Sequence, residues 1–279
     1  MSIVDEPKID CHVHVLDPAR FPYRPDTAYR PSGQEIAPLE QLLPVMETYG
    51  VTHALLVGPN SGYGEDNSCM LDALRRGRGR FKGVAVVPND ASAGDLLRLK
   101  EAGVVGVAWN ATVNGVDFYR SADALVRRLT ELDLFLQLQV EGDQLDAFMP
   151  LIDSARPRLL VDHCGRPLQA AGLGQSGFQT LLRLGREGRA AVKLSGYAKL
   201  SDQPWPHRDA WPFAEALVEA FTLDACLWAS DWPFLKAPSR VDYGPLLVLA
   251  ERLVPDAALR RRWLVDTPRR LFGFQDLTG

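Results

Sequence analysis

Short apolar runs alternate with helical patterns along almost the whole chain. The first run lies in the stretch Lys8–Asp17, where two histidines stand one residue apart, and seven further runs rich in β-branched residues or leucine follow it. The predicted strands after the first are residues 53–58, 81–87, 104–110, 134–140, 158–163, 191–195 and 225–230, and the predicted helices are 36–49, 69–76, 93–102, 122–132, 144–155, 178–187, 211–221 and 245–253.

Eight strand and helix units in one chain predict an α/β fold with a parallel sheet buried on both faces. Closure of that sheet into a (β/α)8 TIM barrel is the simplest arrangement, and an open, doubly wound sheet is the alternative. The length of 279 residues suits one barrel domain as well as two smaller domains. No linker or change in composition divides the chain, so we predict a single barrel domain spanning residues 1–279.

The charge pattern narrows the class of partner. Lysine and arginine are dispersed and the net charge is −4, so we expect neither nucleic acid nor a membrane surface as a partner. The start of the chain does not resemble a signal peptide and no apolar run is long enough to span a bilayer, so we expect a cytoplasmic protein. The four cysteines show no CxxC spacing, which argues against a structural zinc site. A homo-oligomer remains open.

Polar residues interrupt the apolar runs mainly where the strands end. In a (β/α)8 barrel, function resides at the carboxyl ends of strands and in the loops that follow them. The residues at these ends are His12 and His14, Asn110, Gln137 and Gln139, His163, Ser195 and Asp231, in chain order. By the alternation of side chains along a strand, all of these residues except Ser195 are expected to face the mouth of the barrel.

Three histidines and an aspartate among these residues point to an active site. His12, His14, His163 and Asp231 provide the imidazole and carboxylate ligands that a divalent metal such as zinc accepts, with a position left open for water. A single histidine would be weak evidence, because buried histidines are often only hydrogen bonded. Four such residues at three strand ends favour a catalytic interpretation.

Several motifs resemble the amidohydrolase superfamily over essentially the whole chain. They are the two histidines of the first strand, DHCGRP at 162–167, VKLSG at 192–196, SDWP at 230–233 and TPRRLFGF at 267–274. Within the superfamily the chain is most similar to the branch of pyrone-dicarboxylate hydrolases and sugar lactonases. The loop that follows the first strand and the segment 59–67 carry the resemblance to the former.

The resemblance implies a hydrolase that opens a lactone ring by addition of water to the ester carbonyl. Asp231 would take the proton from water and later deliver it to the leaving oxygen. His12, His14 and His163 would polarise the carbonyl, through a metal or directly. Arg166 would bind a substrate carboxylate, for which its planar guanidinium is suited.

Departures from the superfamily pattern bear on the metal and the substrate. The fourth and fifth strands offer Asn110 and Gln137 or Gln139 in place of charged ligands, so a binuclear site is not expected. We therefore predict either no required cofactor or one loosely bound divalent metal, Zn or Mn. No arginine lies on the fourth strand, so a dianionic substrate would depend on Arg166, Lys199 and arginines of the first loop.

Loop residues complete the predicted substrate site. The first loop, rich in proline, tyrosine and arginine and containing Tyr29, is long enough for a lid or a binding loop. Ser61 in the second loop, Asn110 and Gln139 are further candidates for contact with a small lactone substrate. Two other functions remain open: a metal-dependent decarboxylase of an aromatic or enoic acid, and a non-catalytic binder of small molecules.

Overall fold

The computed structural model describes residues 2–275, in which eight parallel strands form one sheet in the order β1 to β8. The strands are β1 (Lys8–Val13), β2 (Val51–Val57), β3 (Phe81–Ala85), β4 (Val104–Asn110), β5 (Phe135–Gln139), β6 (Arg158–Val161), β7 (Ala190–Leu194) and β8 (Cys226–Trp228). Sequential order with helices between the strands is the topology of a (β/α)8 barrel, so the predicted fold class is confirmed.

The helices fall where the apolar spacing predicts them. The helices that follow the strands in turn are α1 (Leu39–Thr48), α2 (Ser68–Arg76), α3 (Ala93–Glu101), α5 (Asp123–Glu131), α6 (Gln144–Ala155), α7 (Ser176–Arg186), α9 (Trp211–Phe221) and α10 (Tyr243–Leu253). Each has an apolar face, as in α7, where Phe178, Leu181 and Leu182 are buried. The apolar periodicity of 3.6 residues was therefore sufficient to predict these helices from the sequence alone.

Short elements within the strand-to-helix connections were not predicted. The connection after β4 contains α4 (Ala111–Asn114) and η2 (Asp117–Tyr119), and the connection after β7 contains α8 (Tyr197–Leu200) and η5 (Arg208–Ala210). The connection after β1 contains η1 (Gly33–Glu35), and the connection after β6 contains η3 (His163–Gly165) and η4 (Gln169–Ala171). Three further short elements, α11 (Ala257–Arg261), η6 (Arg262–Asp266) and α12 (Thr267–Phe272), follow α10 and were not predicted either. One-turn elements show too few apolar repeats for a periodicity to be detected.

Contacts group the chain into two compact units. Unit 1 contains the described residues of Met1–Val87, Leu99–Val105 and Trp228–Gly279, and unit 2 contains Pro88–Arg98 and Gly106–Leu227. The prediction of a single domain therefore stays a prediction.

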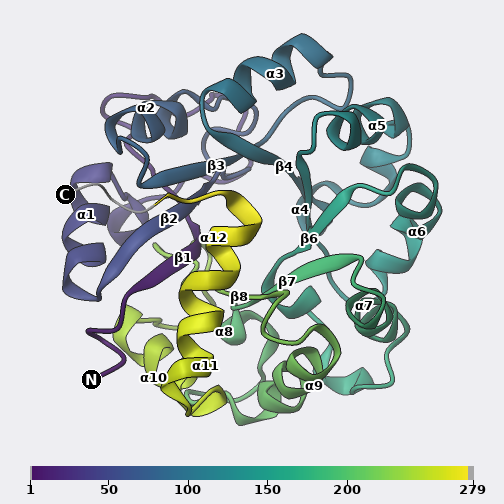
Figure 1. Ribbon diagram of the computed structural model, residues 1–279. Coiled ribbons are helices and arrows are strands. Elements are labelled where there is room, and N and C mark those ends of the chain that lie inside the picture. Colours follow the sequence, from purple (N-terminus) through teal and green to yellow (C-terminus); the bar gives the residue numbers. More distant parts are fainter. Residues whose placement is uncertain (1, 276–279) are drawn as a thin grey trace. The chain divides into compact units, whose positions relative to one another are not determined.

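Unit 1 is organised around β1, whose six residues are all buried. Helix α1 packs against β2 and α2 against β3 (Figure 1). At the amino-terminal side of β1, the Lys8 ammonium is fully buried and donates to the carbonyl oxygens of Val4, Glu6 and Tyr49. The buried Arg260 guanidinium binds the carboxylate of Glu6, and so links α11 to the start of the chain. These contacts hold β1 rigidly at the end opposite its histidines.

Unit 2 is built on β5, β6 and β7, which pair in parallel register. Helices α5, α6, α7 and α9 pack against one another in succession, and Figure 1 shows α5, α6 and α7 following one another outside β6 and β7. The strands are almost wholly buried, as expected for a parallel sheet covered by helices.

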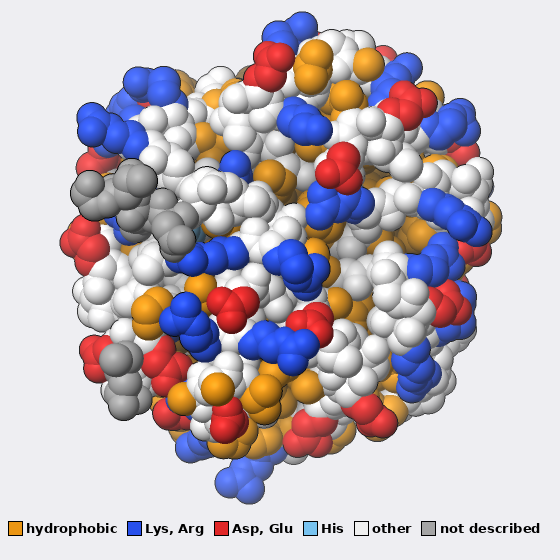
Figure 2. Space-filling view, in the orientation of Figure 1, with side chains coloured by type: hydrophobic (Ala, Val, Ile, Leu, Met, Phe, Trp, Pro, Cys, Tyr) orange, Lys and Arg blue, Asp and Glu red, His pale blue; other side chains and the backbone are white. Residues whose placement is uncertain are grey.

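Among the described residues, no helix combines the length and the apolar character that crossing a bilayer requires. On the face shown in Figure 2, basic and acidic side chains are interspersed.

Candidate active site

His12 and His14 lie at the carboxyl end of β1, as predicted. His12 is the penultimate residue of the strand and His14 follows its end, and both side chains are buried. Their ring centroids are 4.9 Å apart and the rings are almost perpendicular. The alternation of side chains along the strand therefore brings both imidazoles to one face.

The orientation of His14 is set by its second ring nitrogen. His14 Nδ1 lies 2.7 Å from the carbonyl oxygen of Val57, the last residue of β2. Because a carbonyl oxygen only accepts, Nδ1 carries the proton and donates it. In the neutral ring the lone pair is then on Nε2, where it can bind a metal ion or accept a proton.

Asp231 faces both histidines. It lies three residues beyond the end of β8, and its Oδ1 is 3.7 Å from His12 Nε2 and 3.6 Å from His14 Nε2. The side chain is buried, and the backbone has a φ of 65°, in the left-handed region that residues other than glycine rarely adopt. Strained backbone of this kind often occurs at functional sites, where surrounding contacts hold it in place.

The three donor atoms are arranged as metal ligands would be. The ligand atoms of His12, His14 and Asp231 lie within 4.8 Å of one another. Two ligands bound about 2.1 Å from a tetrahedral ion are about 3.4 Å apart. The observed separations of 3.6 and 3.7 Å are close to that value and longer than a direct hydrogen bond. The donor set thus fits one divalent metal, with positions left for water or substrate.

Asp10 is a second buried carboxylate of unit 1, two residues before His12. It is fully buried and accepts hydrogen bonds from the amides of His12 and Ser230 and from the hydroxyl of Tyr243. Burial raises the pKa of Asp10 above its ordinary value, and the hydrogen bonds from Ser230, Tyr243 and His12 oppose that rise.

His163 belongs to unit 2 and lies just beyond the strand that was predicted to contain it. Strand β6 ends at Val161, and His163 begins the short 3-10 turn η3 with a φ of 52°. Its Nδ1 lies 2.9 Å from the hydroxyl oxygen of Ser195, which follows β7. Gly196 comes so close that a Cβ there would be 2.8 Å from the Cβ of His163.

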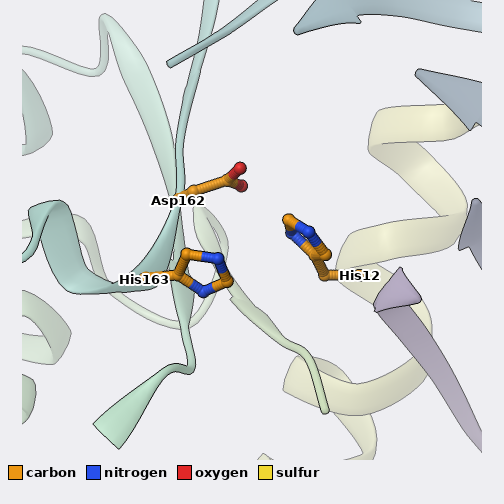
Figure 3. Close-up of side chains that lie close together, drawn as sticks. All are labelled: His12, Asp162 and His163. Carbon is orange, nitrogen blue, oxygen red and sulfur yellow. The ribbon is translucent and has the colours of Figure 1, made fainter. Parts of the chain in front are cut away.

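Asp162 lies beside His163, and Figure 3 shows both side chains projecting to the same side of the segment after β6. The Asp162 carboxylate is held by two buried partners. Lys193 Nζ is 2.9 Å from Asp162 Oδ1, and Gln137 Nε2 donates to Oδ2 at 2.8 Å. Lys193 also donates to Gln137 Oε1 at 2.7 Å. The three side chains close a triangle in which the charge of Asp162 is compensated locally.

Arg166, the predicted carboxylate-binding residue, already has an acidic partner. Its Nη2 lies 2.6 Å from Glu141 Oε2, and the Arg166 side chain is only 19% exposed whereas that of Glu141 is 43% exposed. Among the described residues, no hydrogen-bond acceptor faces the buried Arg166 Nε. One donor of the guanidinium is thus available to an added anion.

The remaining predicted substrate contacts have structural partners as well. Asn110 caps α4, because its Oδ1 accepts from the amides of Thr112 and Val113, and its Nδ2 lies 3.3 Å from Gln139 Oε1. In unit 1, Tyr29 donates to Glu35 at 2.5 Å, under the ammonium of Lys236. Ser61 and Lys199 are half-buried, Ser61 in the loop after β2 and Lys199 in α8. Their roles in substrate binding stay predictions.

The whole chain matches a known family. A family model described as Amidohydrolase aligns with residues 9–274. The chain belongs to the amidohydrolase family. The resemblance predicted from the histidine pair and the DHCGRP and SDWP motifs is therefore confirmed. Strands β2 to β8 and all of β1 except Lys8 fall within the matched range.

Amidohydrolases named after lactone substrates are among its relatives. The chain is 35% identical to a 4-sulfomuconolactone hydrolase of Rhizobium radiobacter over 271 residues, which cover 95% of this chain and 89% of the relative. It is 29% identical to a 2-pyrone-4,6-dicarboxylate hydrolase of Comamonas testosteroni, with coverage of 95% and 89%. A crystal structure from Pseudomonas putida, provisionally assigned as a 2-pyrone-4,6-dicarboxylic acid hydrolase, is 30% identical and has a TM-score of 0.82, with coverage of 96% and 98%.

Three charged residues near the site were not predicted as functional: Asp10, Asp162 and Lys193. Asp10 and Lys193 each had a signal in the sequence. Asp10 shares its strand face with His12, and Lys193 is a charged residue inside an otherwise apolar strand. Their partners could not be inferred, because Tyr243 and Gln137 lie far away along the chain.

Proposed function

We propose that this amidohydrolase is a hydrolase that opens a lactone by attack of water on its ester carbonyl. The observation that carries the proposal is the position of Asp231 Oδ1, 3.6–3.7 Å from the Nε2 atoms of two buried histidines. A carboxylate in this position suits a general base that takes a proton from water while the imidazoles stabilise charge on the carbonyl oxygen.

Asp231 would act twice in the reaction. It first accepts a proton from the attacking water, and it then delivers that proton to the ring oxygen as the ester C–O bond breaks. His14 presents Nε2 to the same space because its Nδ1–H is donated to Val57. The role of His163 in polarising the carbonyl stays a prediction from the sequence, in which His163 comes at the end of a predicted strand.

His12, His14 and Asp231 would also hold a divalent ion such as zinc or manganese. Such an ion, when bound, supplies polarisation of the carbonyl and a lowered pKa of bound water. Asp231 can accept a proton with or without the ion, because one carboxylate oxygen can bind the ion while the other accepts the proton.

The names of the relatives favour an anionic lactone. Sulfonate and carboxylate groups occur in those names, and both groups are charged at neutral pH. Arg166 would bind such a group through its guanidinium, which offers parallel donors to a carboxylate or a sulfonate. A sugar-acid lactone is the second substrate class, as one relative is a D-galactarolactone isomerase with 24% identity.

A lactone panel tests the proposal. Purified protein is assayed with pyrone dicarboxylate, a sulfonated muconolactone and aldonolactones, with and without a chelator, while proton and CO₂ release are followed. We expect proton release without CO₂ on at least one anionic lactone. Release of CO₂ from an aromatic or enoic acid, with no lactone consumed, would contradict the proposal and favour a decarboxylase. Loss of activity on chelation, restored by zinc or manganese, would assign the polarising role to the metal.

A further inference from the structure

Asp10 joins the two chain segments that carry the catalytic groups of unit 1. Its Oδ1 accepts from the amide of His12 at 3.2 Å and from the amide of Ser230 at 2.9 Å. His12 is one of the paired histidines, and Ser230 directly precedes Asp231. One oxygen atom thus ties β1 to the segment after β8.

A second hydrogen bond closes a ring around this junction. The amide of Asp231 donates to the carbonyl oxygen of His12 at 2.9 Å. The ring therefore runs from Asp10 through Ser230 and Asp231 to His12 and back to Asp10. Strand β8 ends at Trp228, so the segment that carries Asp231 lies beyond it. In that segment the amide of Ser230 donates to the carboxylate of Asp10 rather than to a backbone carbonyl oxygen.

The Asp10 carboxylate is itself held in place. Tyr243 of α10 donates to its Oδ2 at 2.7 Å, and the Tyr243 ring stacks on Tyr49 with the ring centroids 4.7 Å apart. Asp10 is fully buried and Tyr243 is nearly so, which leaves the carboxylate little freedom to rotate. An acceptor fixed in this way defines where both amides must lie.

We propose that Asp10 is a positioning residue that sets the distance between Asp231 and His12 through the backbone amides of His12 and Ser230. This inference rests on the proposed function, in which both residues act on one carbonyl. The left-handed φ of 65° at Asp231 needs such a restraint, because a residue other than glycine leaves this conformation unless its neighbours hold it. Asp10 contributes position rather than charge, so a neutral side chain of the same shape should replace it.

Two substitutions separate position from charge. Asp10→Asn keeps Oδ1 as acceptor for both amides, while its NH₂ group donates to the Tyr243 hydroxyl, which can accept. Asp10→Glu keeps the charge but moves the carboxylate by one methylene. We expect kcat of Asp10→Asn to stay within about threefold of the wild type, and kcat of Asp10→Glu to fall about 10²-fold with KM little changed, as for a displacement of about 1 Å.

The control is Arg260→Gln, which breaks a buried ion pair with Glu6 instead. Activities are compared at a temperature at which every variant is folded. Equal kcat for Asp10→Glu and Arg260→Gln would overturn the proposal, and so would a loss in Asp10→Asn as large as that in Asp10→Glu. If Asp10→Glu does not fold, Asp10→Ser, whose hydroxyl is too short to reach Ser230, replaces it.

Crystal structures provide a readout that does not depend on the substrate. In Asp10→Asn we expect the distance between His12 Nε2 and Asp231 Oδ1 to stay near 3.7 Å. In Asp10→Glu or Asp10→Ser we expect that distance to change and Asp231 to leave the left-handed region. An unchanged geometry in the latter variants would overturn the positioning role. Absence of lactone hydrolysis by the wild type would overturn the proposed function alone.

Discussion

Lys193 and Asp162 form an ion pair of 2.9 Å in which the lysine side chain is fully buried and the aspartate is only 2% exposed. Lys193 lies in β7, Asp162 directly follows the end of β6, and Gln137 hydrogen bonds to both side chains. Asp162 immediately precedes His163 in the chain, so the buried ion pair lies directly next to a predicted catalytic residue. Removal of one partner leaves an uncompensated charge in the interior.

We therefore expect Lys193→Met to lower the free energy of unfolding by about 3–5 kcal/mol. Urea unfolding followed by circular dichroism measures the change. Lys100→Met, on the exposed surface of α3, is the control and should change stability by less than about 0.5 kcal/mol. Equal stability of the two variants would show that the Asp162 charge is compensated in another way.

Asp231→Asn should abolish turnover while the fold is retained. Asparagine has nearly the shape of aspartate but cannot accept a proton from water, so we expect kcat to fall by roughly 10²–10⁴-fold. The assay uses a lactone that the wild type hydrolyses, and thermal unfolding checks the fold. Asp242→Asn, an exposed carboxylate paired with Arg240, is the control. Activity of Asp231→Asn at the wild-type level would refute the general base.

Gly196→Ala should displace His163. Gly196 has a φ of 70°, and an added Cβ would lie 2.8 Å from the Cβ and 3.0 Å from the ring of His163. Gly188→Ala is a matched control, because Gly188 has a φ of 65° and no atom within 4 Å of the added Cβ. Both changes carry the same backbone strain, of about 1 kcal/mol. Only Gly196→Ala should lower kcat, by about tenfold or more. Equal activity of the two variants would argue against a role for the His163 position.

Glu141→Gln should release Arg166 from its ion pair. The substrate anion then no longer competes with Glu141 for the guanidinium, so we expect KM for an anionic lactone to fall a few-fold. KM for a neutral lactone should not change, and this comparison is the internal control. A parallel change for both substrates would indicate a general rearrangement of the loop after β5 rather than release of Arg166.

The burial of the Lys8 ammonium leads us to expect a specific pH dependence of the free energy of unfolding. Burial lowers the pKa of Lys8 to about 8, whereas a lysine in the unfolded chain titrates near about 10.4. Between these values the unfolded chain binds more protons than the folded protein, so the free energy of unfolding rises with pH. Lys8→Met lacks this titration. The wild type should therefore gain about 2 kcal/mol over the variant between about pH 7.5 and about pH 10.

Chemical denaturation of both proteins at several pH values measures this difference. Taking the difference cancels the tyrosines and cysteines that titrate in the same range. A difference that does not change with pH would mean that Lys8 stays charged in the folded protein, where it donates to Val4, Glu6 and Tyr49.

The order of strands and helices was determined by the sequence itself, because apolar spacing is a local property. Each of the eight predicted helices overlaps an observed one, and the first strand was placed with its histidines on one face. Candidate residues followed from strand ends, so His12, His14 and Asp231 could be identified before any contact was known. Prediction was weakest where the chain leaves regular structure, as at His163, which lies in a left-handed turn.

Only the tertiary structure decided how these residues are held. Asp10 accepts a hydrogen bond from Ser230, 220 residues away, and Lys193 reaches Gln137, 56 residues away. Such partners depend on which strands are neighbours and on their register, and the local apolar periodicity specifies neither. Apolar patterning can thus name the strands and their ends, whereas hydrogen bonds between distant buried groups, which require matched positions in space, arise only when the chain is folded.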